Sequence, residues 1–356
     1  MAQPSDVIDV RADERLDEPK LQAWLTAQAL PGADAPLAVS QFAGGHANLT
    51  YLLRFGSGDA MHEYVLRRPP LGPVAPGAHD MHREYRALHV LWRAFPPAPR
   101  AFLYCDDAAV IGAPFVVMER RHGIVVRSAV PEAYGGGRDA AANRKLSEVV
   151  IDTLVDFHAV EPDASGLADL GKDPARFLER QVAGWLGRYH RAQTGTLPEA
   201  DALAQWLSDH RPASPKATLL HNDWRLDNIA LDPADPGRCV AVYDWDMCTL
   251  GDPLADLGTL LALWSNRGSA PAGTNPMPTQ TEGFLTREEA VARYGERSGR
   301  DVSHVPWYDV FGTFKMAVVL QQIFFRFAKG QTQDARFKGL EHAARGLFTL
   351  AASRRP

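Results

Sequence analysis

Carboxylate and amide side chains follow two short apolar segments in the second half of the sequence. Residues 221–228 read His-Asn-Asp-Trp-Arg-Leu-Asp-Asn, and Asp244 lies sixteen positions after Asn228. Phosphoryl transfer needs one carboxylate to take the proton of the attacking hydroxyl, and an amide oxygen with a second carboxylate to hold Mg²⁺ on the nucleotide phosphates. The stretch therefore predicts a phosphoryl-transfer centre in which Asp223 is the catalytic base and Asn228 and Asp244 are metal ligands.

The segments that precede these residues are expected to be strands. Asp223 and Asn228 share a loop after the apolar run 218–220, and Asp244 ends a second run, 240–243. Two adjacent strands would bring the three side chains together. The alternative is that these residues only shape turns and cap helices, but that interpretation needs a separate explanation for each of them.

The first third of the chain alternates short apolar runs with turn residues, which is typical of antiparallel hairpins. Strands are expected at 37–42, 50–55, 64–68 and 113–118, and helices at 21–30 and 79–95. From Lys145 onward the apolar residues recur at helical intervals. Helices are expected from 145 onward and at 174–190, 198–210, 254–264, 287–294, 307–327 and 334–350. The pattern predicts an N-terminal sheet lobe and a larger, mostly α C-terminal lobe, with a boundary near Arg121.

The order of these features resembles the aminoglycoside phosphotransferase and choline kinase-like family. There His-Gly-Asp-x-x-x-x-Asn is followed by Ile-Asp-Trp and Gly-Asp-Pro, which appear here as Asp244-Trp245 and Gly251-Asp252-Pro253. Asn222 replaces the usual glycine, and Asn tolerates left-handed backbone dihedrals better than most residues. The resemblance implies an α+β, protein-kinase-like two-lobe fold. Its nucleotide-binding lobe would cover residues 1–120, and its helical catalytic and acceptor-binding lobe 121–356.

A glycine pair and a basic strand are expected to bind the nucleotide phosphates. Gly44 and Gly45 lie between two expected strands, where glycine lets the backbone approach phosphate closely, although such a pair alone is usually just a turn. Protein kinases use a strand lysine paired with a helix glutamate. Here Arg67 stands in place of the lysine, and Glu84 is the acid on the following helix. Arg68 could equally face inward, and alternation along the strand allows only one of the two.

The segment that joins the lobes in this family corresponds to Phe115 through Gly123. The resemblance implies that the backbone carbonyl of Glu119 and the backbone amide of Arg121 recognise the base of the nucleotide. Because backbone atoms do this work, the two residue types carry little information themselves. The expected nucleotide is ATP, with GTP as an alternative, and the expected metal is Mg²⁺.

Two further residues are expected to support the 221–228 loop. No second His or Cys lies at ligand spacing from His221, and Mg²⁺ prefers oxygen, so this histidine is expected to fix the loop by a hydrogen bond. Asp252 before proline has the pattern of a helix N-cap. Asp256 lies one helical turn later, and the resemblance implies that it supports the loop from behind. His158 is expected to be a core residue.

Two groups of motifs narrow the resemblance to one branch of the family. Leu66-Arg67-Arg68-Pro69-Pro70 is followed by His79-Asp80, and Trp307-Tyr308 is followed by Lys315-Met316-Ala317-Val318. These are similar to the kinase-like module that is fused to, or encoded near, acyl-CoA dehydrogenases. The resemblance implies a hydroxyacyl-CoA acceptor and a functional link to an acyl-CoA dehydrogenase.

The composition is typical of a soluble globular protein that acts on a small molecule. The 356 residues are 46% apolar and carry a formal net charge of -5 without long basic blocks, which argues against a nucleic-acid partner. No apolar run approaches the roughly 18 residues that span a bilayer, and residues 1–20 do not resemble a signal segment. We therefore expect no membrane partner and a cytoplasmic location. The three cysteines, Cys105, Cys239 and Cys248, are isolated, which argues against a disulfide framework and structural zinc.

The sequence thus predicts an ATP- and Mg²⁺-dependent kinase for a small-molecule hydroxyl acceptor. A hydroxyacyl-CoA is the acceptor that the resemblance implies, and an amino alcohol or an aminoglycoside is the alternative. The rival class is a non-catalytic kinase-like module that binds nucleotide or acyl-CoA. The absent strand lysine favours this rival, whereas a base beside two metal ligands disfavours it, because a binding protein needs no base.

Overall fold

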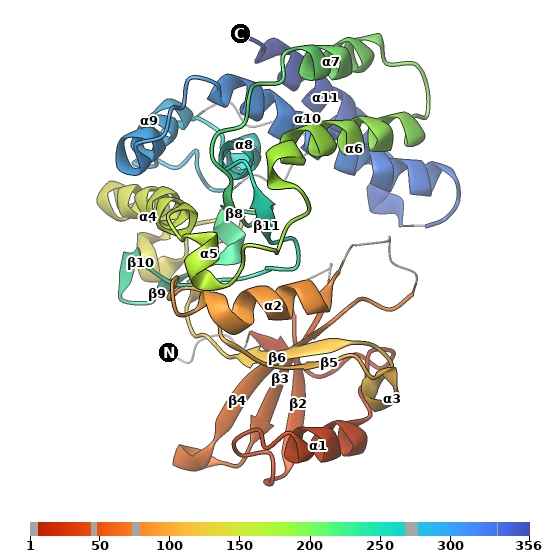
Figure 1. Ribbon diagram of the computed structural model, residues 1–356, viewed down its shortest axis with the longest axis vertical. Coiled ribbons are helices and arrows are strands. Elements are labelled where there is room, and N and C mark those ends of the chain that lie inside the picture. Colours follow the sequence, from red (N-terminus) through yellow and green to blue (C-terminus); the bar gives the residue numbers. More distant parts are fainter. Residues whose placement is uncertain (1–5, 44–47, 73–78, 268–276, 333) are drawn as a thin grey trace. The chain divides into compact units, whose positions relative to one another are not determined.

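The chain forms two compact units in a computed structural model that describes residues 6–43, 48–72, 79–267, 277–332 and 334–356 (Figure 1). The N-terminal unit comprises Met1–His122 together with Tyr243–Cys248. The C-terminal unit comprises Gly123–Val242 and Thr249–Pro356. The short segment Tyr243–Cys248 therefore makes most of its contacts with the N-terminal unit, although it is distant from that unit in sequence.

One antiparallel sheet forms the centre of the N-terminal unit, with the strand order β1-β2-β3-β4-β6-β5. The strands are β1 (Val7–Ile8), β2 (Leu37–Phe42), β3 (Leu49–Phe55), β4 (His62–Arg68), β5 (Ala101–Cys105) and β6 (Phe115–Glu119). The four strands expected from the sequence are present. The two that were not expected, β1 and β5, are too short to display a clear alternating pattern.

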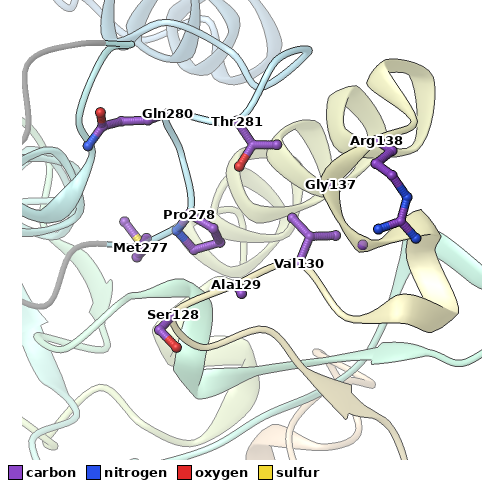
Figure 2. Close-up of a pocket in the computed structure, with 10 residues that line it drawn as sticks. Ser128, Ala129, Val130, Gly137, Arg138, Met277, Pro278, Gln280 and Thr281 are labelled. Atoms are coloured by element: carbon purple, nitrogen blue, oxygen red, sulfur yellow. The ribbon is translucent and has the colours of Figure 1, made fainter.

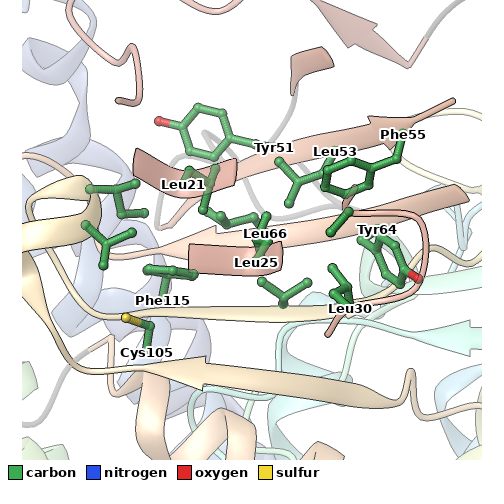
Figure 3. Packing of buried hydrophobic residues seen from close by; sticks show 14 of the residues in the cluster. Leu21, Leu25, Leu30, Tyr51, Leu53, Phe55, Tyr64, Leu66, Cys105 and Phe115 are labelled. Carbon is green, nitrogen blue, oxygen red and sulfur yellow. The ribbon is translucent and has the colours of Figure 1, made fainter. Parts of the chain in front are cut away.

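Helices lie on both faces of this sheet. They are α1 (Glu18–Ala27), the 3₁₀ turn η1 (Gly58–Ala60), α2 (Met81–Leu91) and α3 (Ala108–Ile111). The side chains of α1 and α3 share an apolar core with one face of the sheet (Figure 3). Helix α2 packs against β5 and β6 on the other face (Figure 1).

Alternation along β4 decides which of its two arginines faces which helix. Tyr64 and Leu66 point into the apolar core beneath α1 (Figure 3). Arg68 lies on that face too, and its Nη1 donates a hydrogen bond of 2.7 Å to the backbone carbonyl of Ile111 in α3. Arg67 consequently points to the opposite face of the sheet, toward α2.

The C-terminal unit contains two small sheets, and they correct one expectation. Strands β7 (Ile124–Val125), β9 (Ile229–Asp232) and β10 (Asp235–Val242) form one sheet, and β8 (Thr218–Leu220) pairs with β11 (Thr249–Gly251) in the other. The prediction that runs 218–220 and 240–243 are adjacent strands is wrong. A tight turn after Asp232 pairs β10 with β9 as a hairpin, and β8 takes β11 as its partner instead.

Helices make up the rest of the C-terminal unit, as the sequence predicts. The α-helices are α4 (Ala140–His158), α5 (Pro162–Ser165), α6 (Phe177–Arg191), α7 (Pro198–Asp209), α8 (Leu254–Leu263), α9 (Arg287–Ser298), α10 (Val305–Ala328) and α11 (Leu340–Ser353). Four 3₁₀ turns accompany them among the described residues: η2 (Glu132–Gly137), η3 (Pro174–Arg176), η4 (Leu226–Asn228) and η5 (Ala335–Gly339). The helix expected over 334–350 is therefore a 3₁₀ turn followed by α11.

The central helix pair of this unit, α8 and α10, crosses at two glycines. A Cβ atom on Gly258 would lie 2.4 Å from the carbonyl oxygen of Tyr308, and one on Gly312 would lie 2.2 Å from the carbonyl oxygen of Gly258. Both distances are far below van der Waals contact, so a larger residue at either position would push the helices apart. The close crossing fixes the register between Thr259 on α8 and Lys315 on α10.

Helix α10 is more apolar than the sequence analysis expected. Its 24 residues are long and apolar enough to cross a membrane by length and composition alone. Within the C-terminal unit, however, α10 packs against α6, α8 and α11. This packing buries mainly the first half of the helix, from Val305 to Val318, as in the core helix of a globular protein.

Candidate active site

The two polar residues of the 221–228 loop hold each other in place. The Asn228 side-chain Nδ2 donates hydrogen bonds of 2.9 Å to the Asp223 carbonyl oxygen and of 2.9 Å to Asp223 Oδ2. Both side chains are partly exposed. Because these bonds use the amide nitrogen of Asn228, its Oδ1 is the atom that can serve as a metal ligand, while Asp223 presents an oriented carboxylate.

A buried carboxylate holds the start of this loop from behind. Asp256 on α8 accepts the backbone N–H groups of His221 and Asn222, each at 2.7 Å. Asn222 has a φ of 67°, the left-handed conformation expected of an Asn in the glycine position. Burial raises the pKa of Asp256, but the hydrogen bond from His158 and the nearby His221 outweigh it and hold this pKa below its ordinary value. Asp256 is therefore an ionised acceptor, as two N–H donors require.

His158 completes the support of Asp256 inside the core. Its Nδ1 lies 2.8 Å from the Tyr294 hydroxyl and its Nε2 lies 3.3 Å from Asp256 Oδ2. Burial lowers the pKa of His158 despite the neighbouring Asp256 carboxylate. A neutral ring has one N–H, so these partners assign it to Nε2, which donates to Asp256, while Nδ1 accepts from Tyr294. His158 is thus a core residue that also orients the loop support.

Two buried rings fix the middle of the 221–228 loop. His221 Nδ1 accepts the backbone N–H of Asp223 at 3.3 Å, which is the hydrogen bond expected of this histidine. The Trp224 indole N–H donates to the carbonyl of Val150 at 3.1 Å, and its ring stacks on Phe157 of α4 with centroids 5.9 Å apart. The carboxylate of Asp223 is therefore carried by a loop with anchors on both sides.

In the N-terminal unit, Arg67 lies between two acids. Its Nη1 is 2.9 Å from Glu84 Oε1 and its Nη2 is 2.6 Å from Asp244 Oδ1. Burial raises the pKa of Glu84 to about 7, even though Arg67 acts in the opposite direction. The arginine thus makes the ion pair with the helix acid that the lysine of protein kinases makes, and it also touches the expected metal ligand.

A second cluster in this unit was not predicted from the sequence. Asn48 Nδ2 donates to Asp246 Oδ2 at 3.1 Å, and its Oδ1 lies 2.9 Å from His79 Nδ1. Asp246 is buried, as the third residue of Asp-Trp-Asp would be if both acids turned inward. Gly44 and Gly45, expected to cover phosphate, lie outside the described residues, and Asn48 is the described residue that follows them.

The segment expected to read the nucleotide base lies at the end of β6. The Arg121 Nε is 2.9 Å from Glu119 Oε2, so the two side chains pair with each other. The hydroxyl of Tyr243 donates to the Arg121 carbonyl at 3.2 Å. The backbone atoms proposed for base recognition, the Glu119 carbonyl and the Arg121 amide, are not the atoms in these contacts, and their role stays a prediction.

A pocket of about 380 Å³ lies beside the loop in the C-terminal unit (Figure 2). It is lined by Ser128–Val130, Gly136–Arg138, Met277, Pro278, Gln280 and Thr281. The pocket borders the loop through Met277, whose Sδ accepts the backbone N–H of Leu226 at 3.2 Å.

The proteins similar to this chain are phosphotransferases and proteins with acyl-CoA dehydrogenase names. A model of the phosphotransferase enzyme family (APH) matches residues 38–296. Acyl-CoA dehydrogenase family member 11 of Gallus gallus is 32% identical over 344 residues, which cover 93% of this chain and 42% of that protein. The chain spans less than half the length of the curated relatives that it matches.

Solved structures show the same fold. A protein of Ralstonia eutropha JMP134, provisionally assigned as an aminoglycoside phosphotransferase, aligns with a TM-score of 0.79 at 29% identity, covering 96% of this chain and 98% of that one. A thermostable mutant of aminoglycoside phosphotransferase APH(4)-Ia, solved with ADP and hygromycin B, aligns with a TM-score of 0.56 at 13% identity, covering 94% and 98%. With a family match over most of its length and a relative of this identity across nearly all of it, the chain belongs to the phosphotransferase enzyme family.

Proposed function

We propose that this phosphotransferase is a kinase that transfers the γ-phosphoryl group of ATP to a hydroxyl group of a small molecule. The observation that carries the proposal is the Asp223 carboxylate, held by Asn228 in a loop that Asp256 pins through two backbone N–H groups. A protein that only binds its ligand has no need of a carboxylate oriented in this way. A kinase needs it to direct the attacking hydroxyl.

In the proposed reaction Asp223 takes the proton of the acceptor hydroxyl. The hydroxyl oxygen forms a bond to the γ-phosphorus while the bond from that phosphorus to the bridging oxygen breaks. The nucleoside diphosphate leaves with the electron pair of the broken bond, and the proton passes from Asp223 to solvent. A positioned general base of this kind contributes about 10²- to 10⁴-fold to the rate.

The oxygen donors of Asn228 and Asp244 suit Mg²⁺, which usually takes only one or two protein ligands and completes its shell with water and phosphate oxygens. A bound Mg²⁺ would neutralise negative charge on the nucleotide phosphates. Arg67 would add a permanent positive charge there, since a guanidinium can contact phosphate through two N–H groups. ATP is proposed over GTP on resemblance alone, since structures of this fold were solved with either nucleotide: ADP in APH(4)-Ia and GDP in the aminoglycoside 2'-phosphotransferase IIIa.

A hydroxyacyl-CoA is the acceptor that we propose for this kinase. Its support is the relatives' names, which are those of acyl-CoA dehydrogenase family members, and the motifs around Arg67 and Lys315. The matched part covers 42% of the Gallus gallus relative. We therefore propose a functional link between this kinase and an acyl-CoA dehydrogenase. We propose no dehydrogenase activity for the chain itself.

The test is product formation by wild type and two matched loop variants. The protein would be incubated with ATP, Mg²⁺ and a panel of hydroxyacyl-CoAs, amino alcohols and aminoglycosides, with phosphorylated products detected by mass spectrometry. Asp223→Asn should lose about 10²- to 10⁴-fold in turnover while still binding nucleotide. Asp227→Asn is the control, because Asp227 lies in the same loop but pairs with Arg225. Wild-type turnover by Asp223→Asn would refute the assignment, and nucleotide binding without any product would favour a binding module.

A further inference from the structure

A lysine on the central helix of the C-terminal unit has an unusual environment. Lys315 Nζ donates one hydrogen bond, of 3.1 Å, to the hydroxyl of Thr259. The same atom lies 5.6 Å from the ring centroid of Trp185 and 5.9 Å from that of Phe311. An ammonium group has three N–H donors, and a single neutral hydroxyl satisfies one of them. Aromatic faces attract a cation but accept no strong hydrogen bond.

No acid forms an ion pair with Lys315 among the residues that the structure describes. Burial lowers the pKa of Lys315, while the negative charges of Asp256 and Asp223 act against this shift. Hydrogen bonds link Lys315 to the loop of Asp223: Thr259, which accepts from Lys315, lies one turn after Asp256 on α8, and Asp256 holds the start of that loop. Lys315 and Asp223 both belong to the C-terminal unit, so this link is a property of that unit alone.

A second cation shares the same indole ring. The Cζ atom of Arg188, on α6, lies 4.6 Å from the ring centroid of Trp185. Arg188 is exposed, and it too lacks an acidic partner among the described residues. Its positive charge is one of the influences that lower the pKa of Lys315. Two cations on one aromatic ring repel each other, and a bound anion would relieve this repulsion.

A purely structural role explains the arrangement poorly. A lysine can cover aromatic rings with its aliphatic stem, but a methionine or leucine would fill the same space without adding a second cation to the Trp185 ring. Cations that remain unpaired beside a proposed catalytic base instead suit a ligand that brings the missing negative charge. The ligand proposed here is the acceptor, because the nucleotide phosphates already have other proposed partners: Arg67 directly, and Asn228 and Asp244 through Mg²⁺.

We infer that Lys315, with Arg188 on the same Trp185 ring, binds an anionic group of the acceptor and so positions its hydroxyl for Asp223. This inference rests on the proposed function and narrows its acceptor to anionic molecules. Carboxylates and phosphates share the required chemistry, since each accepts charge-assisted hydrogen bonds from an ammonium group and a guanidinium. A polycationic aminoglycoside would be repelled by both side chains.

Binding measurements test the inference independently of turnover. Three probes share the hydroxyhexanoyl group and differ in what is attached to it: hydroxyhexanoyl-coenzyme A carries phosphates, the hydroxyhexanoyl thioester of pantetheine carries no charge, and free hydroxyhexanoate carries a carboxylate. Their affinities would be measured by calorimetry for wild type, Lys315→Met, Lys315→Arg and Arg188→Gln. Arg180→Gln is the control, because Arg180 is an exposed residue of the same helix whose guanidinium bonds to backbone carbonyls of the preceding turn.

We expect Lys315→Met to weaken binding of an anionic probe by roughly tenfold or more, the loss typical of a hydrogen bond to a charged group. Lys315→Arg should restore part of the lost affinity. Arg188→Gln should lower the affinity less than Lys315→Met does, since an exposed charge is screened by salt. Arg180→Gln should bind like wild type. A loss in Lys315→Met that is confined to the coenzyme A ester would assign the anion as phosphate, and a loss confined to free hydroxyhexanoate would assign it as carboxylate.

Several outcomes would overturn the inference. One is equal binding of every probe by wild type and Lys315→Met, and another is a loss of affinity for the uncharged pantetheine ester as large as the loss for the anionic probes. If Lys315→Met fails to fold, unaltered anion binding by Arg188→Gln at low salt would count against the site. Failure of the proposed function looks different: wild type would bind the anionic probes and Lys315→Met would not, but no phosphorylated product would form.

Discussion

The two groups of proposed site residues are held in place by different forces. In the C-terminal unit, the 221–228 loop is fixed by backbone N–H groups that donate to the buried Asp256. In the N-terminal unit, Arg67 is held by ion pairs with Glu84 and Asp244. Backbone hydrogen bonds to a buried carboxylate fix one geometry. Ion pairs between side chains can exchange partners, so Arg67 can release Asp244 when phosphate oxygens replace it.

This difference suggests a preformed base and an adaptable phosphate site. A base must stand in one orientation to take a proton, so its loop benefits from rigid support. A cation that binds phosphate must instead be available when the nucleotide arrives. The three predictions that follow test this contrast.

The largest effect is expected when the loop support is removed. Asp256→Ala removes the carboxylate that accepts the backbone N–H groups of His221 and Asn222, and removing the partner of a buried polar group costs about 1–3 kcal/mol. We expect a loss of several kcal/mol in the free energy of unfolding in urea, together with a fall in turnover at least as large as that of Asp223→Asn. Nucleotide affinity of the folded fraction should fall less than turnover, because Asn228 is only one of the residues proposed to hold the nucleotide and its metal ion. A variant with wild-type stability would show that the loop does not depend on Asp256.

An intermediate effect, on nucleotide affinity, is expected from the two adjacent arginines of β4. Arg67→Met should weaken binding of a non-hydrolysable ATP analogue with Mg²⁺ by about tenfold, since it removes a charged hydrogen-bond donor to phosphate. Arg68→Met is the matched control, because Arg68 is the next residue but bonds to the Ile111 carbonyl on the other face. It should cost about 1 kcal/mol of stability and leave nucleotide affinity within about twofold. Equal losses of affinity in the two variants would contradict the assignment to Arg67.

The smallest effect concerns the pH dependence of stability. The pKa of His158 is lower in the folded protein than its ordinary value of 6.5, so the unfolded chain binds an extra proton as the pH falls below 6.5. The contribution of neutral His158 to the free energy of unfolding is thus fully present above pH 6.5. It is lost as the pH falls toward the pKa that His158 has in the folded protein. Each pH unit in that window can cost up to about 1.4 kcal/mol. His158→Gln, whose side chain can still donate to Asp256, should show a smaller fall in Tm between pH 7 and pH 5 than wild type. Parallel Tm profiles would argue against a neutral buried His158.

Much of the local structure was predictable, because periodicity depends on sequence neighbours. The four main strands and the helical second half follow from apolar spacing. Asn222 could be assigned a left-handed conformation, since few residue types tolerate it, and its φ of 67° agrees. The pairing of β8 with β11 could not be predicted, because short apolar strands of similar composition offer several partners and the choice depends on the whole unit.

The site shows the same division. Motif spacing singled out Asp223, Asn228, Asp244, Arg67 and Glu84, but it assigned no role to Asp246 or Lys315. Their significance arises from residues distant in sequence: Asn48 donates to Asp246, and Trp185 and Thr259 surround Lys315. A single sequence gives the type of each residue but does not show which distant residues become its neighbours in the fold.

By itself, the sequence determined the class of chemistry and the order of its parts, because phosphoryl transfer requires particular side chains at short spacings within one loop. The tertiary structure decided which of Arg67 and Arg68 faces the acids, what holds the 221–228 loop from behind, and that Lys315 shares an indole with Arg188. Side-chain direction and burial depend on the packing of whole elements, such as the close crossing of α8 and α10 at Gly258 and Gly312. That packing is set by contacts between residues far apart in the chain.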